Sequence, residues 1–146
     1  MKELNKLWHS IMSNAKFSEI EERYSLLKQF STSEISIIRI VSENDDVIIK
    51  DIIDALKVPK STLTSIIDRL ERKNIIVRDI SVRDRRSYKL KLTKEGVKVQ
   101  KEHEEFENQC LKKILISLDT NEEREQLLSL LGKINNSCKR TKDEDK

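Results

Sequence analysis

The sequence predicts a mainly α-helical protein with one small two-stranded β-ribbon, and three observations support this fold class. The 146 residues include only two glycines and one proline, too few for the many turns of a β-sandwich or barrel. Apolar residues recur at helical spacing along most of the chain. An alternating pattern, typical of strands, is found only between residues 75 and 92.

The composition indicates a small, highly charged globular protein. Charged residues make up 38% of the chain and hydrophobic residues 36%, so long helical faces are expected to be exposed. No run approaches the roughly 18 apolar residues of a membrane span, and the N-terminal stretch is too polar for a secretory signal. We therefore expect a cytoplasmic protein with no membrane partner, whose two cysteines are thiols.

The first thirty residues contain two successive sets of apolar residues at helical spacing. The first set is Leu4, Leu7, Trp8, Ile11, Met12 and Ala15, and the second is Phe17, Ile20, Tyr24, Leu27 and Phe30. A new helix is predicted to begin at Ser31, because Glu34 three residues later completes a capping box. The polar residues 44–46 are expected to end that helix in a turn.

The middle of the chain predicts a short strand and two further helices. Val47 and Ile48 are expected to form the strand, and a brief helix follows over Ile52, Ile53 and Leu56. The second helix follows Pro59, which a first helical turn tolerates, and ends at Asn74, which tolerates a left-handed conformation. Its predicted inward face is Leu63, Ile66, Ile67 and Leu70.

After Asn74 the apolar period changes from helical to two. The alternating residues Ile75, Val77, Tyr88, Leu90 and Leu92 predict a half-buried ribbon with arginines in its loop. Thr93 is placed to cap a long helix through Val97, Phe106, Cys110, Ile114 and Leu118. A last helix is predicted to begin at Thr120, with Glu123 in capping-box position, and residues 139–146 are predicted to form a disordered tail.

Two short helices joined by a tight turn and followed by a ribbon describe a winged helix-turn-helix. An α-helix fits the major groove of DNA, and the ribbon, or wing, can reach the adjacent minor groove, where a narrow tract attracts arginine. From Lys60 to Lys91 ten basic residues stand against four acidic ones, a net charge of +6 in a chain whose total is +3. This concentration predicts a surface for double-stranded DNA.

The candidate DNA-binding residues fall into two groups. On the helix after Pro59 they are Lys60, Ser61, Thr62, Thr64, Ser65 and Arg69, and in the wing they are Arg83, Asp84, Arg85, Arg86 and Lys89. Small hydroxyl side chains can bond to phosphates or base edges, and arginine can enter the minor groove. The alternative is a solvated hydroxyl-rich face beside a solvated charge cluster, but the direct succession of the two groups favours DNA binding.

The stretches "STLTSIIDRLERKNII" and "VRDISVRDRRSYKLKLTKEG" resemble the recognition helix and wing of the MarR family of bacterial transcriptional regulators. The resemblance includes an Asp-x-Arg tip at residues 84–86 and a Leu-Thr-x-x-Gly exit at residues 92–96, and the helical order on either side also fits. It implies that Arg86 enters the minor groove and that Asp84 pairs with a neighbouring arginine. Two departures are Asn74, where the family usually has glycine, and Ser65, where many members have arginine. The second departure puts direct base reading at that position in doubt.

The resemblance also implies a homodimer whose terminal helices intertwine, and the apolar stripes near both ends agree with this. The expected organisation is an N-terminal dimerisation helix region (1–30), a winged helix-turn-helix DNA-binding domain (31–93), C-terminal dimerisation helices (94–138) and the tail (139–146). Such a dimer would read two half-sites about 34–36 Å apart in a pseudo-palindromic operator, usually as a repressor. A compact monomer that folds these helices back on itself is the alternative.

The remaining motifs predict no catalytic chemistry. The sequence "HEEFE" at residues 103–107 lacks the second histidine of a zinc-protease motif, so we expect no metal, no cofactor and no enzymatic activity. Cys138, beside two basic residues, is the candidate redox residue, and Trp8, His9 and Met12 are the candidate pocket for a small aromatic effector. Two rival functions stay open: a winged-helix protein-interaction module and a low-specificity, nucleoid-type DNA binder.

Overall fold

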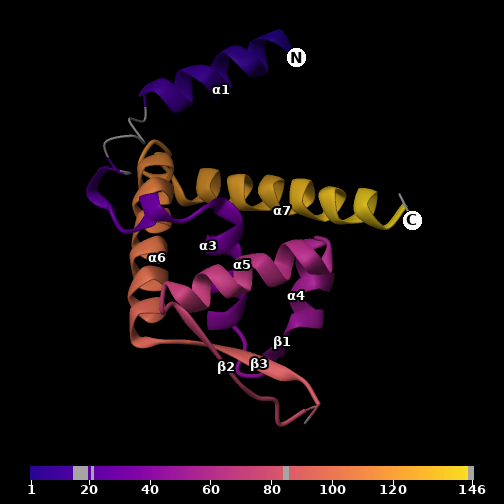
Figure 1. Ribbon diagram of the computed structural model, residues 1–146. Coiled ribbons are helices and arrows are strands. Elements are labelled where there is room, and N and C mark those ends of the chain that lie inside the picture. The colour runs from indigo at the N-terminus through magenta and orange to yellow at the C-terminus, as the bar shows by residue number, and fades with distance from the viewer. Residues whose placement is uncertain (15–19, 21, 84–85, 145–146) are drawn as a thin grey trace. The chain divides into compact units, whose positions relative to one another are not determined.

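The computed structural model describes residues 1–14, 20, 22–83 and 86–144, apart from the side chains of Met12, Asn14 and residues 138–144 (Figure 1). The elements follow the chain in this order: α1 (Lys2–Asn14), η1 (Leu27–Gln29), α3 (Thr32–Ser42), β1 (Val47–Ile48), α4 (Ile49–Leu56), α5 (Lys60–Arg72), β2 (Ile76–Ile80), β3 (Tyr88–Leu92), α6 (Lys94–Leu115) and α7 (Asn121–Glu144). The mainly helical fold with a small β-wing is confirmed.

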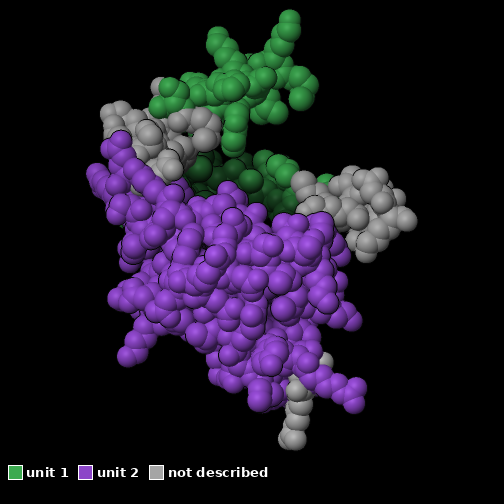
Figure 2. Space-filling view, in the orientation of Figure 1, with its two compact units in different colours: residues 1–17, 108–146 green, residues 18–107 purple. Residues whose placement is uncertain are grey.

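The chain forms two compact units (Figure 2). One comprises residues 18–107 and contains the helix-turn-helix and the wing. The other comprises residues 1–17 and 108–146, so α6 contributes to both.

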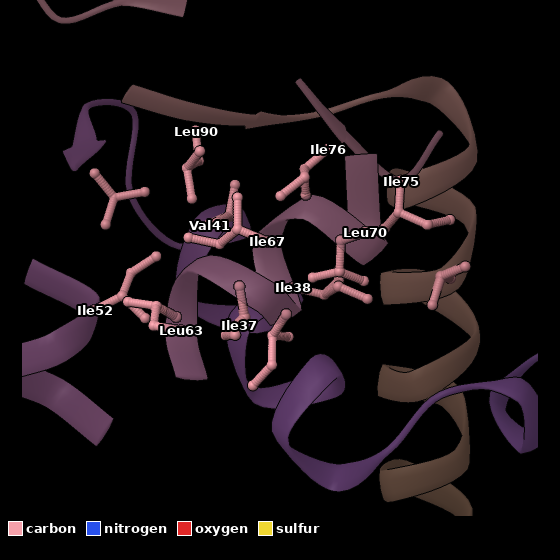
Figure 3. Close-up of a cluster of buried hydrophobic side chains, with 13 residues drawn as sticks. Ile37, Ile38, Val41, Ile52, Leu63, Ile67, Leu70, Ile75, Ile76 and Leu90 are labelled. Carbon is pink, nitrogen blue, oxygen red and sulfur yellow. The ribbon is translucent and has the colours of Figure 1, made fainter. Parts of the chain in front are cut away.

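The core of the larger unit lies between α3, α4, α5 and the sheet (Figure 3). The inward stripe of α5 is confirmed, since its four predicted residues are all buried. Ile37 and Ile38 of α3, Ile52 of α4 and Leu90 of β3 are fully buried against this stripe. Burial of aliphatic side chains of this size contributes about 1.5–3 kcal/mol each. The same apolar contacts therefore stabilise the core and hold the outward face of α5 in place.

The sheet has three antiparallel strands in the order β1-β3-β2. The short strand predicted at Val47 and Ile48 is confirmed as β1, and it pairs with the predicted ribbon. Val47 pairs with Leu90, and Ile76 pairs with Leu92. This register corrects one expectation. Val77, predicted to face inward, is 44% exposed, while Ile75 and Ile76 are both buried. The reason is the turn at Asn74, which binds the Ile75 amide to the Leu70 carbonyl (2.9 Å) and so places two consecutive isoleucines against the core.

The predicted helix starts are confirmed by their hydrogen bonds. At α3 the Ser31 amide donates to Glu34 Oε2 (2.8 Å) and the Glu34 amide donates to Ser31 Oγ (3.3 Å). Thr120 and Glu123 form the same reciprocal pair at α7. Asn74 has φ 57°, the left-handed conformation expected of it. Local sequence therefore determines where these helices begin and where α5 ends.

The wing returns to the start of α6 through one tight junction. The Ile75 carbonyl accepts the Thr93 amide (3.0 Å), and the Thr93 hydroxyl donates to the Asn74 carbonyl (2.6 Å). The same hydroxyl oxygen accepts the Gly96 amide (3.0 Å), which caps α6 as predicted. Gly96 packs directly on the Ile75 carbonyl, and a Cβ atom at this position would overlap that oxygen.

The terminal helices differ from the larger unit in exposure. Leu4, Leu7, Trp8 and Ile11 of α1 are exposed, and so are Leu128, Leu131 and Ile134 of α7. The exposure of Met12 and Ala15 lies outside the described part of the chain. α7 continues to Glu144 and therefore includes most of the tail that was expected to be disordered. This tail contains no glycine or proline, and three lysines, one arginine and one glutamate among its eight residues are good helix formers. Among the described helices, none is long and apolar enough to span a membrane.

We predict that Gly96→Ala destabilises the protein by about 1–3 kcal/mol, because the added methyl group forces the wing and α6 apart. Chemical denaturation followed by circular dichroism would measure the loss. Gly132→Ala is the matched control, since no atom of the described residues lies within 4 Å of the new methyl group. That helix-interior change should leave stability unchanged or raise it by up to about 1 kcal/mol. Equal stability of the Gly96→Ala variant and the wild type would contradict the close packing of Gly96 on the Ile75 carbonyl.

Candidate nucleic-acid interface

The outward face of α5 carries the first group of candidate residues. Lys60, Ser61, Thr62, Ser65 and Arg69 are exposed, and Thr64 is half-buried. They lie opposite the buried stripe because residues three and four apart share one side of a helix. Pro59 precedes this face in an extended conformation, with ψ 143°. The structure therefore presents these side chains to solvent on one rigid helix.

Two of the hydroxyl groups are already engaged within α5. Thr64 Oγ1 donates to the Lys60 carbonyl (2.9 Å), and Ser65 Oγ donates to the Ser61 carbonyl (3.0 Å). Phosphate oxygens only accept hydrogen bonds, so these hydroxyls would have to break an intrahelical bond to reach one. Ser61 and Thr62 are therefore better placed than Thr64 and Ser65 to donate to a phosphate.

The far end of α5 is fixed to the start of α3 through Lys73. Its ammonium donates to the Gln29 carbonyl (2.9 Å) and to Glu34 Oε1 (3.1 Å), and lies 4.6 Å from the centre of the Phe30 ring. Glu34 is only 4% exposed. Burial raises the pKa of Glu34, but the hydrogen bonds from Ser31 and Lys73 outweigh it and hold the pKa below its ordinary value. The sequence indicated only the capping role of Glu34.

The wing brings two candidate residues from separate elements together. A cavity of about 490 Å³ lies between α4, the start of α5 and the wing. It is lined by Ile48, Ile49, Lys50, Ile53, Lys60, Arg86, Ser87 and Tyr88. Lys60 of the helix and Arg86 of the wing thus line the same hollow, and both are exposed. Lys50, in the first turn of α4, joins them and was not among the residues expected from the sequence.

Arg83 differs from Arg86 in its surroundings. Its guanidinium donates to Asp51 Oδ2 (2.5 Å), and its amide donates to Asp46 Oδ2 (2.9 Å). Burial raises the pKa of Asp51, but the hydrogen bonds from the Ile48 amide and Arg83 outweigh this effect and hold the pKa below its ordinary value. The remaining wing candidates Asp84 and Arg85 lie outside the described residues.

Ion pairs neutralise part of the basic segment. Lys73 pairs with Glu34, Arg78 with Asp68 and Glu71, Arg83 with Asp51, and Lys91 with Asp79. The hydrogen bond from Lys91 lowers the pKa of Asp79. Lys89 is half-buried and stands opposite Asp79 in the strand register. The net charge of the segment therefore overstates the positive charge available to a polyanion.

The other candidates lie in different places. Trp8 lines a cavity of about 450 Å³ formed by α1 residues, whereas His9 is not part of its lining. The side chains of Met12 and Cys138 lie outside the described part of the chain. His103 Nε2 lies 3.6 Å from a Glu107 carboxylate oxygen on α6. No group of three metal-binding side chains is present among the described residues.

The sequence of the larger unit matches one protein family, and the fold of the chain resembles several solved structures. Residues 30–88, from the start of α3 to the first residue of β3, match the MarR family. The fold resembles that of Streptococcus pneumoniae FabT in complex with DNA, with 29% identity, a TM-score of 0.72 and 99% of each chain covered. It also resembles Bacillus subtilis YusO (22% identity, TM-score 0.68, 93% and 94% covered) and the Staphylococcus aureus MepR-DNA complex (21%, 0.63, 94% and 99%). The last two show likeness of fold. Curated protein sequences give no match.

We predict that Glu34→Gln lowers the free energy of unfolding by about 1–3 kcal/mol at pH 7, because Lys73 loses a charged hydrogen-bond partner. The pKa of Glu34 is lowered in the folded protein, so its contribution is complete above its ordinary pKa and is lost as the pH falls through the folded value. Denaturation curves of both proteins from pH 7 to about pH 3 should therefore converge on acidification.

Glu43→Gln is the control for this experiment. Glu43 lies at the other end of α3, and its pair with Arg39 is long (3.9 Å) and exposed. Its loss should change stability by less than about 1 kcal/mol at any pH. If the difference in the free energy of unfolding between wild type and Glu34→Gln does not decrease at low pH, the charged Glu34–Lys73 pair is excluded as the cause of the destabilisation.

Proposed function

Because residues 30–88 match the MarR family, we propose that the chain is a member of this family and a DNA-binding transcriptional regulator that acts as a homodimer. The observation that carries this proposal is the hollow that Lys60 and Arg86 share, since it joins the start of α5 to the wing. The DNA in the FabT and MepR structures supports the same conclusion. The proposal assigns no catalytic reaction to the chain.

In this proposal α5 enters the major groove and the wing follows the adjacent minor groove. Ser61 and Thr62 bind phosphates or base edges, and Arg69, exposed two turns further along α5, binds phosphate. Arg86 is the residue that enters the minor groove, where negative potential is concentrated. The regulator acts as a repressor by covering a pseudo-palindromic operator, which a two-fold symmetric dimer can match.

The dimer is proposed from the exposed apolar residues of the terminal helices. Leu4, Leu7, Trp8 and Ile11 of α1 are 49–65% exposed, and Leu131 and Ile134 of α7 are 49% and 59% exposed. Contiguous apolar surface of this kind marks an association site, because its burial is favourable. We place the small aromatic effector in the α1 cavity beside Trp8. A thiol switch at Cys138 is the alternative signal.

We predict that Arg86→Ala weakens DNA binding about 10-fold at 0.1 M salt and lowers the slope of log K against log salt by about one. Fluorescence anisotropy with labelled DNA from upstream of the protein's own gene, with unrelated DNA as competitor, measures both. Lys28→Ala is the control. Lys28 adjoins Gln29, which contacts the far end of α5, about 20 Å along the helix from Lys60.

Three outcomes of the titration differ in meaning. Binding that survives competitor and depends on Arg86 supports the sequence-specific regulator. Binding that competitor abolishes favours the nucleoid-type DNA binder. Absence of binding at low salt contradicts the DNA-binding function and favours the protein-interaction module.

We predict that the wild-type chain sediments as a dimer at micromolar concentration and that Leu131→Glu shifts it to monomer. The substitution places a charge in the apolar face of α7, and a desolvated unpaired charge opposes association. Analytical ultracentrifugation gives the mass directly. Lys133→Glu reverses a charge on the same helix at a position that is already polar, and it should remain dimeric. A monomeric wild type would refute the dimer.

A further inference from the structure

The distal end of the wing depends on side chains from the opposite edge of the sheet. β3 is the central strand, β2 is an edge strand, and β1 forms the other edge. The chain leaves β2 at Ile80 and reaches Asp46 and Asp51, which lie on either side of β1. No strand pairs with the outer edge of β2 among the described residues. The Ser81 amide donates to the Ser87 carbonyl across the hairpin (3.1 Å), and the two carboxylates attach this loop to the segment of β1 and α4.

Asp46 holds the backbone of the loop. Its Oδ2 accepts the Ser81 hydroxyl (3.1 Å) and the Arg83 amide (2.9 Å), and Ser81 is fully buried. A carboxylate that accepts two hydrogen bonds in a partly buried site gives well-defined geometry. The loop is thereby fixed at the first and third residues after β2.

Asp51 holds the side chain of Arg83. Its Oδ2 accepts the Arg83 guanidinium (2.5 Å) and also the Ile48 amide (3.0 Å), which precedes α4. The carboxylate is therefore oriented by the first turn of α4 before it meets the arginine. Backbone and side chain of Arg83 are both attached to the segment that carries α4.

We propose that Arg83 is a wing-positioning residue that acts through Asp51 and does not bind phosphate. This inference rests on the proposed DNA-binding function. An arginine in contact with a carboxylate has little net charge to offer a phosphate, and leaving that carboxylate would release the loop. Arg86 differs because it lines the hollow shared with Lys60. Arg83 thus makes the helix-turn-helix and the wing approach DNA as one body.

The two roles predict opposite effects of one substitution. If Arg83 positions the wing, Asp51→Asn breaks the pair and weakens DNA binding. If Arg83 binds phosphate, the same substitution releases its charge and removes a negative group, so binding becomes tighter. Asparagine retains an oxygen that accepts the Ile48 amide, so α4 keeps its start. Salt dependence separates the roles again, since each phosphate contact adds about 0.9 to the slope.

The experiment compares the full-length wild type with Arg83→Gln, Asp51→Asn and the double variant on DNA that the wild type binds. We expect each single variant to bind about 5- to 10-fold more weakly, the double variant to be no weaker than either, and the salt slope to stay unchanged. Asp54→Asn is the control, because it removes an exposed acidic charge from the same helix. Its affinity should be equal to or slightly tighter than that of the wild type.

Amide hydrogen exchange of Arg83 tests the pair without DNA. Exchange should be at least 10-fold faster in Arg83→Gln and Asp51→Asn than in the wild type and in Asp54→Asn, because the loop is released. Unchanged exchange would refute the positioning role whatever the DNA result. A salt slope lowered by about one in Arg83→Gln, with tighter binding by Asp51→Asn, would show a direct phosphate contact instead. A wild type that binds no DNA but shows the exchange difference would refute the regulator and leave the loop attachment standing.

Discussion

The carbonyl of Ile75 is the point on which the DNA-facing part of the molecule depends. It accepts the Thr93 amide, and Gly96 packs against it, so the entry of β2, the exit of β3 and the start of α6 meet at one peptide group. Asn74 makes the meeting geometrically feasible, since its left-handed conformation ends α5 and turns the chain toward the sheet. The direction of the wing relative to α5 follows from this junction. Any candidate contact in the wing therefore depends on the packing of Gly96 and Thr93 against the Ile75 carbonyl.

The basic residues of the DNA-facing unit have two roles that the composition does not separate. Some form ion pairs within the unit, and others line the proposed DNA-binding hollow. Lys73 joins the end of α5 to Glu34, Arg78 joins β2 to Asp68 of α5, and Lys91 pairs with Asp79 across the wing. The exposed pairs of Arg78 and Lys91 contribute little stability individually, but they set side-chain positions. The pair of Lys73 differs, because its partner Glu34 is buried. Lys60 and Arg86 line a hollow between α4, the start of α5 and the wing. The polyanion-binding surface that we propose is narrower than the basic segment of the sequence.

The two units differ in how far their apolar side chains are buried. The unit of residues 18–107 has a closed apolar core, in which Ile37, Ile67 and Leu90 are completely buried. The helices α1 and α7 of the other unit carry apolar residues that stay exposed in a single chain. A second copy would cover these residues and would also supply the second half-site reader that a palindromic site requires. Stability and DNA recognition would then depend on the same association.

The sequence by itself determined the features that arise from neighbouring residues. The capping boxes of α3 and α7, the stripe of α5, the left-handed Asn74 and the cap at Thr93 all involve groups within a few positions, or a period that one element displays. Only the tertiary structure decided the pairing of the predicted strand Val47–Ile48 with β3, the burial of Ile76 in place of Val77, and the assignment of Arg83 to Asp51. The strand pairing and the Arg83–Asp51 contact join residues 30 or more positions apart. The burial of Ile76 follows from the turn at Asn74 and from the register of β2 with β3. A charged side chain has the same appearance in sequence whether it meets solvent, a phosphate or a carboxylate, because its partner is chosen by the fold.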